Sequence, residues 1–464
     1  MGEGRLLTGW GRTSPSWARV VAPGDTGELS AELSGGRAGA SGSASTTRII
    51  ARGLGRSYGD AAQCAGGTVI DVGRLSDIGP IDPESGLVTV GGGTSLQHLL
   101  ERSLLEGWFV PVTPGTRQVS IGGAIAADVH GKNHHHDGSF CGHVTSLTLS
   151  TPTGIIQTGP ALDPELFWAT AGGMGLTGVV TDATVRMTPV ETSRMLVDTE
   201  RFTDLDGVMA AMEEGDAGYR YSVAWVDTAA GRKRAGRSVL TRGDHAAIDD
   251  LPASLRSRPL EAPRPARLRV RQTAPSGLLN AATVAAFNAA WYHRAPRRRT
   301  GELQDMATFF HPLDGVDGWN RLYGPRGFLQ YQFAVGPHRG DVVHQAIRLL
   351  ADGGTPSFLA VLKRFGPGDP GPLSFPIEGW TLALDLPLGP PELARATDQL
   401  DEMVAQAGGR VYLAKDARLR PELIQVMYPR LDELQEVRER VDPSGLLCSD
   451  LSRRLGMDRA RIER

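Results

Sequence analysis

The sequence is poor in cysteine, in lysine and in long apolar runs, and each shortage excludes a class of protein. The three cysteines, Cys64, Cys141 and Cys448, are far apart and form no C-x-x-C pair, which excludes a disulfide framework and a zinc knuckle. No apolar run reaches the roughly 18 residues of a membrane-spanning helix. The N-terminus, MGEGRLLTGWGRTSPSW, lacks the apolar core of a signal peptide, so we expect a soluble chain made in the cytoplasm. A net charge of -3 over 464 residues gives no basis for binding nucleic acid, and the length predicts two or three globular domains.

Lysine is almost absent. Only four of the 49 basic residues are lysines, namely Lys132, Lys233, Lys363 and Lys415, as expected of a GC-rich genome. Because arginine replaces lysine wherever either cation is sufficient, each remaining lysine is a candidate for a position that needs a compact, titratable amine. The alternative is that these lysines persist by chance.

Glycine is abundant, and three Gly-rich segments lie at 51–61, 115–123 and 172–178. The first, within ARGLGRSYGDAA, directly follows a short predicted strand, TTRII. A Gly-rich turn after a strand lets the backbone approach a ligand closely, and bare backbone N–H groups bind anions, phosphates above all. Any one segment could be a surface loop. Together, in one α+β unit, they predict an extended, phosphate-bearing cofactor between two lobes.

The segment GGMGLTG contains a formal G-x-G-x-x-G at Gly173, Gly175 and Gly178. A dinucleotide-binding turn has a strand before it and a helix after it. Here the preceding ELFWAT is helical and the following GVVTDATV is strand-like, so we reject a Rossmann nucleotide fold and expect a tight helix-to-strand turn.

The segment HGKNHHHDG carries His130, His134, His135 and His136. No Glu or Cys lies at ligand spacing and adjacent histidines cannot all converge on one ion, so we predict no metal site. A polar loop near a buried cofactor is the alternative that we favour.

The pattern of predicted secondary structure changes near residue 195. Before it, the sequence predicts an α+β unit. Its elements are a short helix within 24–45, strands, a helix capped near Ser95, a strand pair in VTSLTLSTPTGIIQT, a helix from Pro164 and the strand GVVTDATVRMTPV. After it, RYSVAWVD, GFLQYQFAV, SFLAVLKRFG and GWTLALDLPL predict longer strands of a second sheet, with helices near 341–352 and 391–407. Residues 251–300 hold ten arginines, no lysine and one acid, and we expect part of them to be mobile loop. From GRVYLA onward the chain predicts a strand and then helices.

The order of ARGLGRSYGD, PGTRQVSIGGAIAADVHGKN and FWATAGGMGLTG resembles the FAD-binding module of the vanillyl-alcohol oxidase/p-cresol methylhydroxylase superfamily. Through LTGWGRT, FHPLD, WNRLYGP, LSFPIEGW, AKDAR, MYPR and SDLSRRL, the chain is similar nearly end to end to the decaprenylphosphoryl-β-D-ribose 2′-oxidase family of actinobacterial cell-wall synthesis. The resemblance implies an α+β protein with a two-lobed FAD-binding domain, residues 1–194 and 410–464. A substrate domain at 195–409, built on an antiparallel sheet with flanking helices, lies between them.

The resemblance also implies which residues hold the FAD. These are Ala51, Arg52, Gly53, Leu54, Gly55, Arg56, Ser57, Tyr58, Gly59, Asp60, Ala61, Gly115, Ser120, Ile121, Gly122, Gly123, Ala127, Asp128, Val129, His130, Val180 and Tyr412. Many superfamily members bond the flavin to a His shortly after the first glycines. This chain has GLGRSYG there, with Arg56 and no His, so we predict non-covalent FAD.

The implied reaction is oxidation of the ribose 2′-hydroxyl of decaprenylphosphoryl-ribose to the 2′-ketone, after which an NAD-dependent reductase completes epimerisation to the arabinose lipid. By resemblance the catalytic residues are Lys415, His130, Gln332 and Asp385. The substrate-binding residues are Lys132, Gln330, Lys363, Trp225, Phe310 and Ala383. Ala383 stands where many members have Cys, and Phe310 replaces a Tyr of close relatives. Three of the four lysines belong to these two sets.

Three questions stay open at this stage. Lys415 could act as a base or as an electrostatic stabiliser, and its ion pair with the neighbouring Asp416 would be a purely structural alternative. The arginine-rich residues 251–300 predict peripheral attachment to an anionic membrane surface, which the resemblance places in the cell envelope. The alternative is that these residues form a solvated basic loop. A sugar or aldonolactone oxidase of the same fold, or a non-catalytic flavin-binding module, are the alternative functions.

Overall fold

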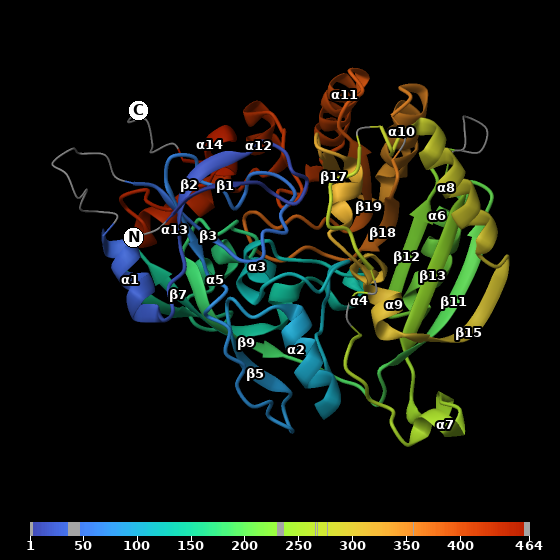
Figure 1. The fold of residues 1–464 in the computed structure, drawn as a ribbon, viewed down its shortest axis with the longest axis horizontal. Coiled ribbons are helices and arrows are strands. Elements are labelled where there is room, and N and C mark those ends of the chain that lie inside the picture. Colours follow the sequence, from blue (N-terminus) through green and yellow to red (C-terminus); the bar gives the residue numbers. More distant parts are fainter. Residues whose placement is uncertain are drawn as a thin grey trace.

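The computed structural model describes residues 3–35, 47–229, 236–264, 266, 268–275, 277–355 and 357–458. Lys233 and most of the predicted loop at the end of 24–45 lie outside these residues. Figure 1 shows two lobes side by side, with the blue, teal and red segments in one lobe and most green, yellow and orange segments in the other. Both ends of the chain therefore contribute to the first lobe.

Two four-stranded sheets form the first lobe. One has the order β1-β2-β4-β3 and the other the order β5-β9-β7-β8. Their strands are β1 (Glu3–Leu7), β2 (Ser16–Val21), β3 (Ile49–Arg52), β4 (Thr68–Asp71), β5 (Leu87–Gly91), β7 (Val144–Thr151), β8 (Gly154–Thr158) and β9 (Val179–Arg186). The helices of this lobe are α1 (Thr26–Gly35), α2 (Leu96–Ser103), α3 (Ile121–Ala126), α5 (Pro164–Thr170), α12 (Pro421–Met427), α13 (Leu431–Val441) and α14 (Asp450–Arg454).

Local sequence explains where the helices of this lobe begin. The Ser95 side chain accepts a hydrogen bond from the N–H of His98 and so caps α2, as predicted. The Ser120 side chain caps α3 by accepting from the N–H of Gly123. α5 begins at Pro164, with Asp163 as its N-cap. The Ser120 cap thereby fixes the start of α3, whose first turn belongs to the second Gly-rich segment.

The second lobe contains one eight-stranded sheet of order β15-β11-β13-β12-β18-β19-β17-β20, and every pair of neighbours in it is antiparallel. The strands are β11 (Arg194–Phe202), β12 (Tyr221–Val226), β13 (Ser238–His245), β15 (Arg298–Asp305), β17 (Phe328–Val335), β18 (Ala360–Phe365), β19 (Gly379–Pro387) and β20 (Arg410–Val411). Its helices are α4 (His134–Asp137), α6 (Leu205–Gly215), α7 (Ala253–Arg256), α8 (Ala281–Arg294), α9 (Met306–Phe310), α10 (Gly340–Asp352) and α11 (Glu392–Gln406). Two short strand pairs, β6 (Trp108–Phe109) with β10 (Thr188–Pro189) and β14 (Leu268–Arg269) with β16 (Val316–Asp317), complete the described elements.

The two faces of the large sheet have different neighbours. α6, α10 and α11 contact its strands and cover one face, where residues such as Phe333, Leu362 and Leu382 are fully buried. β17 and β19 are almost completely buried along their length, which suits their nearly continuous apolar sequences. The opposite face looks toward the first lobe, so its residues are available for a site between the lobes.

The α+β class and the antiparallel second sheet are confirmed. The predicted strands at 68–72, 87–91, 144–158, 179–186, 221–226, 328–335, 360–365 and 379–387 are present, as are the helices near 341–352 and 391–407. β20 joins β17, so the strands of the large sheet come from residues 194–411. We propose domain boundaries at 194/195 and 409/410, with β20 pairing back to β17 across the second one.

The arginine-rich residues 251–300 include a helix that the sequence did not predict. Residues 281–294 form α8, which the Asn280 side chain caps by accepting from the N–H groups of Ala282 and Thr283. Several arginines also have acidic partners, for example Arg269 with Asp317 at 2.7 Å, which reduces the free positive charge of this region.

Candidate active site

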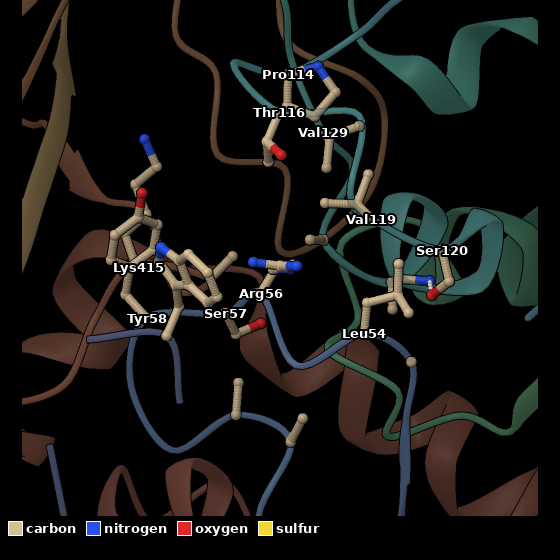
Figure 2. Close-up of a pocket in the computed structure, with 18 of the residues that line it drawn as sticks. Leu54, Arg56, Ser57, Tyr58, Pro114, Thr116, Val119, Ser120, Val129 and Lys415 are labelled. Carbon is tan, nitrogen blue, oxygen red and sulfur yellow. Dashed lines mark hydrogen bonds between the residues drawn. The ribbon is translucent and has the colours of Figure 1, made fainter. Parts of the chain in front are cut away.

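A deep cleft opens between the first lobe and the free face of the large sheet. It encloses about 1870 Å³ of space between protein atoms, part of which is open to solvent. The predicted residues that line it are Ala51, Gly53, Leu54, Gly55, Arg56, Ser57, Tyr58, Ala61, Gly115, Ser120, Gly122, Gly123, Ala127, Val129, His130, Val180, Gln330, Gln332, Lys363, Ala383, Tyr412 and Lys415. Figure 2 shows Arg56, Ser57 and Tyr58 on one side and Val119 and Ser120 on another. All three Gly-rich segments therefore meet at one cavity.

The loop after β3 needs glycine because neighbouring chain segments touch its backbone. A Cβ at Gly53 would overlap the Oγ of Ser120, and a Cβ at Gly59 would overlap the carbonyl of Asp416. Gly55 has a φ of +62°, a left-handed conformation that side chains disfavour. The loop is thus pressed between the second Gly-rich segment and the C-terminal return.

The same loop carries backbone donors with no acceptor. Within the described part of the chain, the N–H groups of residues 53–57 donate to nothing, whereas the next N–H, that of Tyr58, donates to the carbonyl of Ala414 at 2.9 Å. A row of free amides beside a large cleft is the chemistry that binds a pyrophosphate. The loop therefore fits the phosphates of a dinucleotide cofactor.

The third segment forms the predicted helix-to-strand turn, between α5 and β9. Gly175 has a φ of +79°, and the neighbouring Met174 has a φ of 55°. The N–H of Met174 donates to the carbonyl of Ala126 at 2.8 Å, which ties the turn to α3. Met174, Gly175 and Gly178 all line the cleft, and the Rossmann interpretation is excluded by this order of elements.

Strand register places the polar side chains of the large sheet on the cleft face in rows. Trp225, Val361, Ala383 and Gln332 are direct partners across four neighbouring strands. The next row toward one end pairs Asp385 with Gln330, and the next row toward the other end pairs Lys363 with Thr381. Because direct partners point to the same face, these side chains lie together.

His130 and Gln332 contact each other at the base of the cleft. The Gln332 amide lies 2.9 Å from His130 Nε2 and donates to the Thr381 hydroxyl at 2.9 Å. Burial, with help from Lys363 and Lys415, holds the pKa of His130 well below its usual value, so the imidazole is neutral at pH 7. Its Nδ1 and the Gln332 Oε1 are buried without a partner in the described residues, which is typical of atoms that bind a ligand.

Lys415 and Asp385 form an electrostatic pair near Tyr58. Burial lowers the pKa of Lys415 to about 8, and Asp385 partly opposes this shift. Burial raises the pKa of Asp385 to about 6, although hydrogen bonds from Gln330 and Tyr323 favour its ionised form. Near pH 7 most of Lys415 is an ammonium ion and most of Asp385 a carboxylate.

The structural alternative for Lys415 was wrong. Asp416 does not pair with Lys415 but with Arg454, at 2.8 Å, and Arg454 also binds Asp60 through two nitrogens at 2.8 and 2.9 Å. Lys415 faces the cleft, with its Nζ 5.9 Å from the centre of the Tyr58 ring. Its ammonium is therefore free to meet a ligand.

Nine predicted site residues do not line the cleft. Arg52, Gly59, Asp60, Ile121 and Asp128 belong to the cofactor set, Lys132, Trp225 and Phe310 to the substrate set, and Asp385 to the catalytic set. Several of them have structural partners instead. The Arg52 guanidinium donates to the carbonyls of Thr8 and Ala62, and Phe310 packs against Tyr221 with ring centres 4.8 Å apart.

Four of these residues still lie one step behind the cleft wall. Lys132 donates to the carbonyl of Phe309, and burial lowers its pKa to about 7. Asp385 reaches the cleft through Gln330, and Trp225 neighbours Val361 on the same sheet face. Asp128 Oδ2 and Asp369 Oδ2 are both buried without a donor in the described residues, and burial together with each other's charge raises the pKa of the Asp128 carboxyl.

Sequence reasoning missed several hydrophobic wall residues. The cleft is also lined by Trp10, Pro114, Thr116, Val119, Thr170, Met174, Leu313, Trp319, Leu359 and Val361. Trp10 and Trp319 lie in LTGWGRT and WNRLYGP, which carried the family resemblance without an assigned role.

The four histidines of the loop at 130–136 have separate partners. His134 Nδ1 accepts from the N–H of Gly366, and His135 Nε2 lies 2.9 Å from the carbonyl of Tyr219. Among the residues that the structure describes, no group of three or more His, Cys, Asp or Glu side chains could hold a metal ion. Across the same residues, none of the helices has the length and apolarity to cross a bilayer.

Comparison with known proteins agrees with the class that this cleft defines. Residues 17–159 match the family described as FAD binding domain, and residues 391–455 match D-arabinono-1,4-lactone oxidase. The protein is an FAD-dependent oxidoreductase with the fold expected from the vanillyl-alcohol oxidase resemblance. The chain is 43% identical over 459 residues, 97% of both chains, to decaprenylphosphoryl-beta-D-ribose oxidase of Mycolicibacterium smegmatis. It belongs to the decaprenylphosphoryl-β-D-ribose oxidase family.

Two further relatives differ in how much of this chain they match. An "uncharacterized protein in mprA 5'region" of Streptomyces coelicolor is 44% identical over 370 residues, which cover 78% of this chain and 100% of that protein. Cytokinin dehydrogenase 5 of Oryza sativa subsp. japonica is 30% identical over 160 residues, only 32% of this chain and 30% of its own. Of these three relatives, the first two match most of this chain and the third matches about a third of it.

Proposed function

We propose that the protein oxidises the 2′-hydroxyl of decaprenylphosphoryl-β-D-ribose to the 2′-ketone, the first half of epimerisation to the arabinose lipid of cell-wall arabinan. In this reaction a hydride leaves C2′, the hydroxyl loses its proton, and the O–H electron pair forms the carbonyl bond. The observation that carries the proposal is the group of Gln330, Gln332 and Lys415 on the cleft wall, facing a loop of free backbone amides. Amide and ammonium groups can hold a sugar hydroxyl in a fixed position.

The residues present fit FAD. The amides of 53–57 would bind the pyrophosphate. The rest of the cofactor would be enclosed by Ser120, Gly122, Gly123, Ala127, Val129, His130, Val180 and Tyr412. When bound, FAD supplies the hydride acceptor. Tyr412 would fix the relation of cofactor and sheet, because its N–H donates to the carbonyl of Gln332 and its hydroxyl to that of Ala127.

Lys415 would place a positive charge where negative charge develops on hydride transfer. Its pKa of about 8 keeps it mostly protonated near pH 7, which favours the electrostatic role over the base role. His130, neutral and with a free Nδ1, would exchange a hydrogen bond with the sugar, oriented by Gln332. Lys363 would add a donor from the adjacent row, where its Nζ already lies 3.3 Å from the carbonyl of Gly131.

A lactone oxidase is the second candidate, because residues 391–455 match the D-arabinono-1,4-lactone oxidase family. A non-catalytic flavin-binding module is the third. Anaerobic addition of each compound to the holoenzyme, with flavin absorbance as the readout, separates them. Bleaching by decaprenylphosphoryl-ribose and not by D-arabinono-1,4-lactone supports the proposal. The reverse pattern identifies a lactone oxidase, and bleaching by neither identifies a binding module.

The partners follow from the product and from the substrate. A 2′-keto sugar needs an NAD-dependent reductase to become the arabinose epimer. A lipid-linked substrate requires access to a bilayer, so peripheral attachment at the cell envelope is part of the proposal. Arginines among 251–300 that have no acidic partner within the described residues, such as Arg271 and Arg294, would supply the attraction to anionic lipid.

A further inference from the structure

Six aromatic rings form an unbroken series of contacts from the cleft to an exposed part of α8; we name it the aromatic path. Its members in order are Trp10, Trp319, Tyr323, Phe358, Phe287 and Trp291. The ring centres of successive members are 5.8, 6.2, 6.2, 4.7 and 6.2 Å apart. Trp10 and Trp319 line the cleft, so the path begins at the site already described.

The outer end of the aromatic path, on α8, is exposed to solvent. Phe287 is 44% exposed and Trp291 is 46% exposed, and their rings stack at 16°. α8 packs against the protein through its other side, where Val284, Asn288 and Tyr292 are buried. Two large adjacent apolar rings left in solvent, one turn apart, mark a surface that binds something apolar.

The inner end of the path carries an unpaired cation. The Arg56 guanidinium lies 3.9 Å from the centre of the Trp10 ring, and its Nε is buried without a hydrogen-bond partner in the described residues. Asp314 and Asp317 are the nearest acids, but Asp314 accepts from Thr116 and Arg117 and Asp317 from Arg269. Arg56 is therefore available to a phosphate at the start of the path.

We propose that the prenyl-phosphate arm of the substrate leaves the cleft past Arg56 and that its apolar chain lies along the aromatic path to Phe287 and Trp291. This rests on the proposed function for the identity of the lipid. A membrane surface is the competing occupant of exposed aromatic side chains. Continuity with the cleft favours the substrate chain, because a bilayer contact on α8 alone would not need the ring contacts through Phe358 and Tyr323.

The test compares long and short prenyl phosphates on the holoenzyme in mild detergent. Decaprenyl phosphate should bind the Phe287→Ala/Trp291→Ala variant about 10-fold more weakly than the unchanged protein, whereas geranyl phosphate, too short to reach α8, should bind both equally. A 10-fold change corresponds to about 1.4 kcal/mol. Arg56→Gln should weaken both phosphates alike, with FAD content measured in parallel. For the Phe287→Ala/Trp291→Ala variant, KM for the two corresponding phosphoryl-riboses should follow the same pattern while kcat stays unchanged.

The matched control is Trp17→Ala, because Trp17 is a 63% exposed tryptophan on β2, outside the path. Equal affinity of decaprenyl phosphate for the α8 variant and the unchanged protein overturns the proposal, as does an equal loss for both chain lengths. Loss of liposome binding without loss of decaprenyl phosphate affinity assigns the surface to the membrane instead. Because binding is measured without a sugar, failure of flavin bleaching by the phosphoryl-ribose would refute the proposed function alone.

Discussion

Replacement of Lys415 by alanine should slow flavin reduction by the sugar substrate at least about 100-fold while FAD remains bound. A 100-fold loss corresponds to about 2.7 kcal/mol of transition-state stabilisation. Two unit charges about 4 Å apart interact by about 4 kcal/mol at an effective dielectric constant of 20, so a half-buried ammonium is sufficient to account for it. FAD binding should persist because the free amides of 53–57, and not Lys415, face the phosphates in our proposal.

The substitution should also change the pH profile. Lys415 favours the ionised form of Asp385, so its removal should raise the pKa of Asp385 above about 6. In the unchanged protein the electrostatic role predicts that the reduction rate falls as the pH rises through about 8, because the ammonium loses its proton. A base role predicts a rate that rises over the same interval.

Anaerobic stopped-flow measurement of flavin bleaching is the assay, with FAD content and melting temperature as controls for folding. Lys415→Arg should restore little activity, since the guanidinium is larger and does not titrate. Near-normal reduction rates in both variants would remove Lys415 from the mechanism.

Four further predictions concern the cofactor, the sheet, the membrane and stability. Acid precipitation should release the yellow colour into the supernatant, and colour in the pellet would show covalent FAD. Nitro-aromatic inhibitors that act through a semimercaptal should leave no adduct by mass spectrometry, because Ala383 has no thiol, whereas Ala383→Cys should acquire one. Binding to anionic liposomes should fall steeply with salt, since each basic residue contributes about 1 kcal/mol within a Debye length; salt-independent binding would count against the arginines of 251–300. The raised pKa values of Asp128 and Asp369 mean that the native state holds a proton which the unfolded chain releases, so this pair destabilises the fold as pH rises through the native pKa. Asp369→Asn should therefore raise the melting temperature more at pH 8 than at pH 5, and an equal shift at both would contradict this reasoning.

The sequence predicted the site best where backbone geometry depends on glycine. Gly53 and Gly59 lie where another segment excludes a Cβ, and that requirement is visible as a run of glycines after a strand. Strands such as 328–335 and 379–387 were also predictable, because buried central strands have nearly continuous apolar sequences.

Side-chain direction was not predictable. Asp60 lies in a cofactor-binding loop but turns to Arg454, a partner 394 residues away in the sequence. Trp10 and Trp319 reach the cleft from distant segments, and no local pattern signals that convergence. α8 was missed because its Ala-rich sequence has a weak amphipathic pattern, although Asn280 was a readable cap.

The ion pairs of Arg454 with Asp60 and Asp416 have a consequence for biosynthesis. Arg454 is synthesised 394 residues after Asp60, so the loop that it holds leaves the ribosome long before its partner exists. The backbone N–H of Tyr58 likewise lacks its acceptor, the carbonyl of Ala414, until Ala414 has been synthesised. At about 5–20 residues per second, this loop must remain unclosed for tens of seconds while the residues between Asp60 and Arg454 are translated. Stable closure of this loop therefore requires synthesis as far as Arg454, and a chain that terminates before Arg454 should not retain FAD.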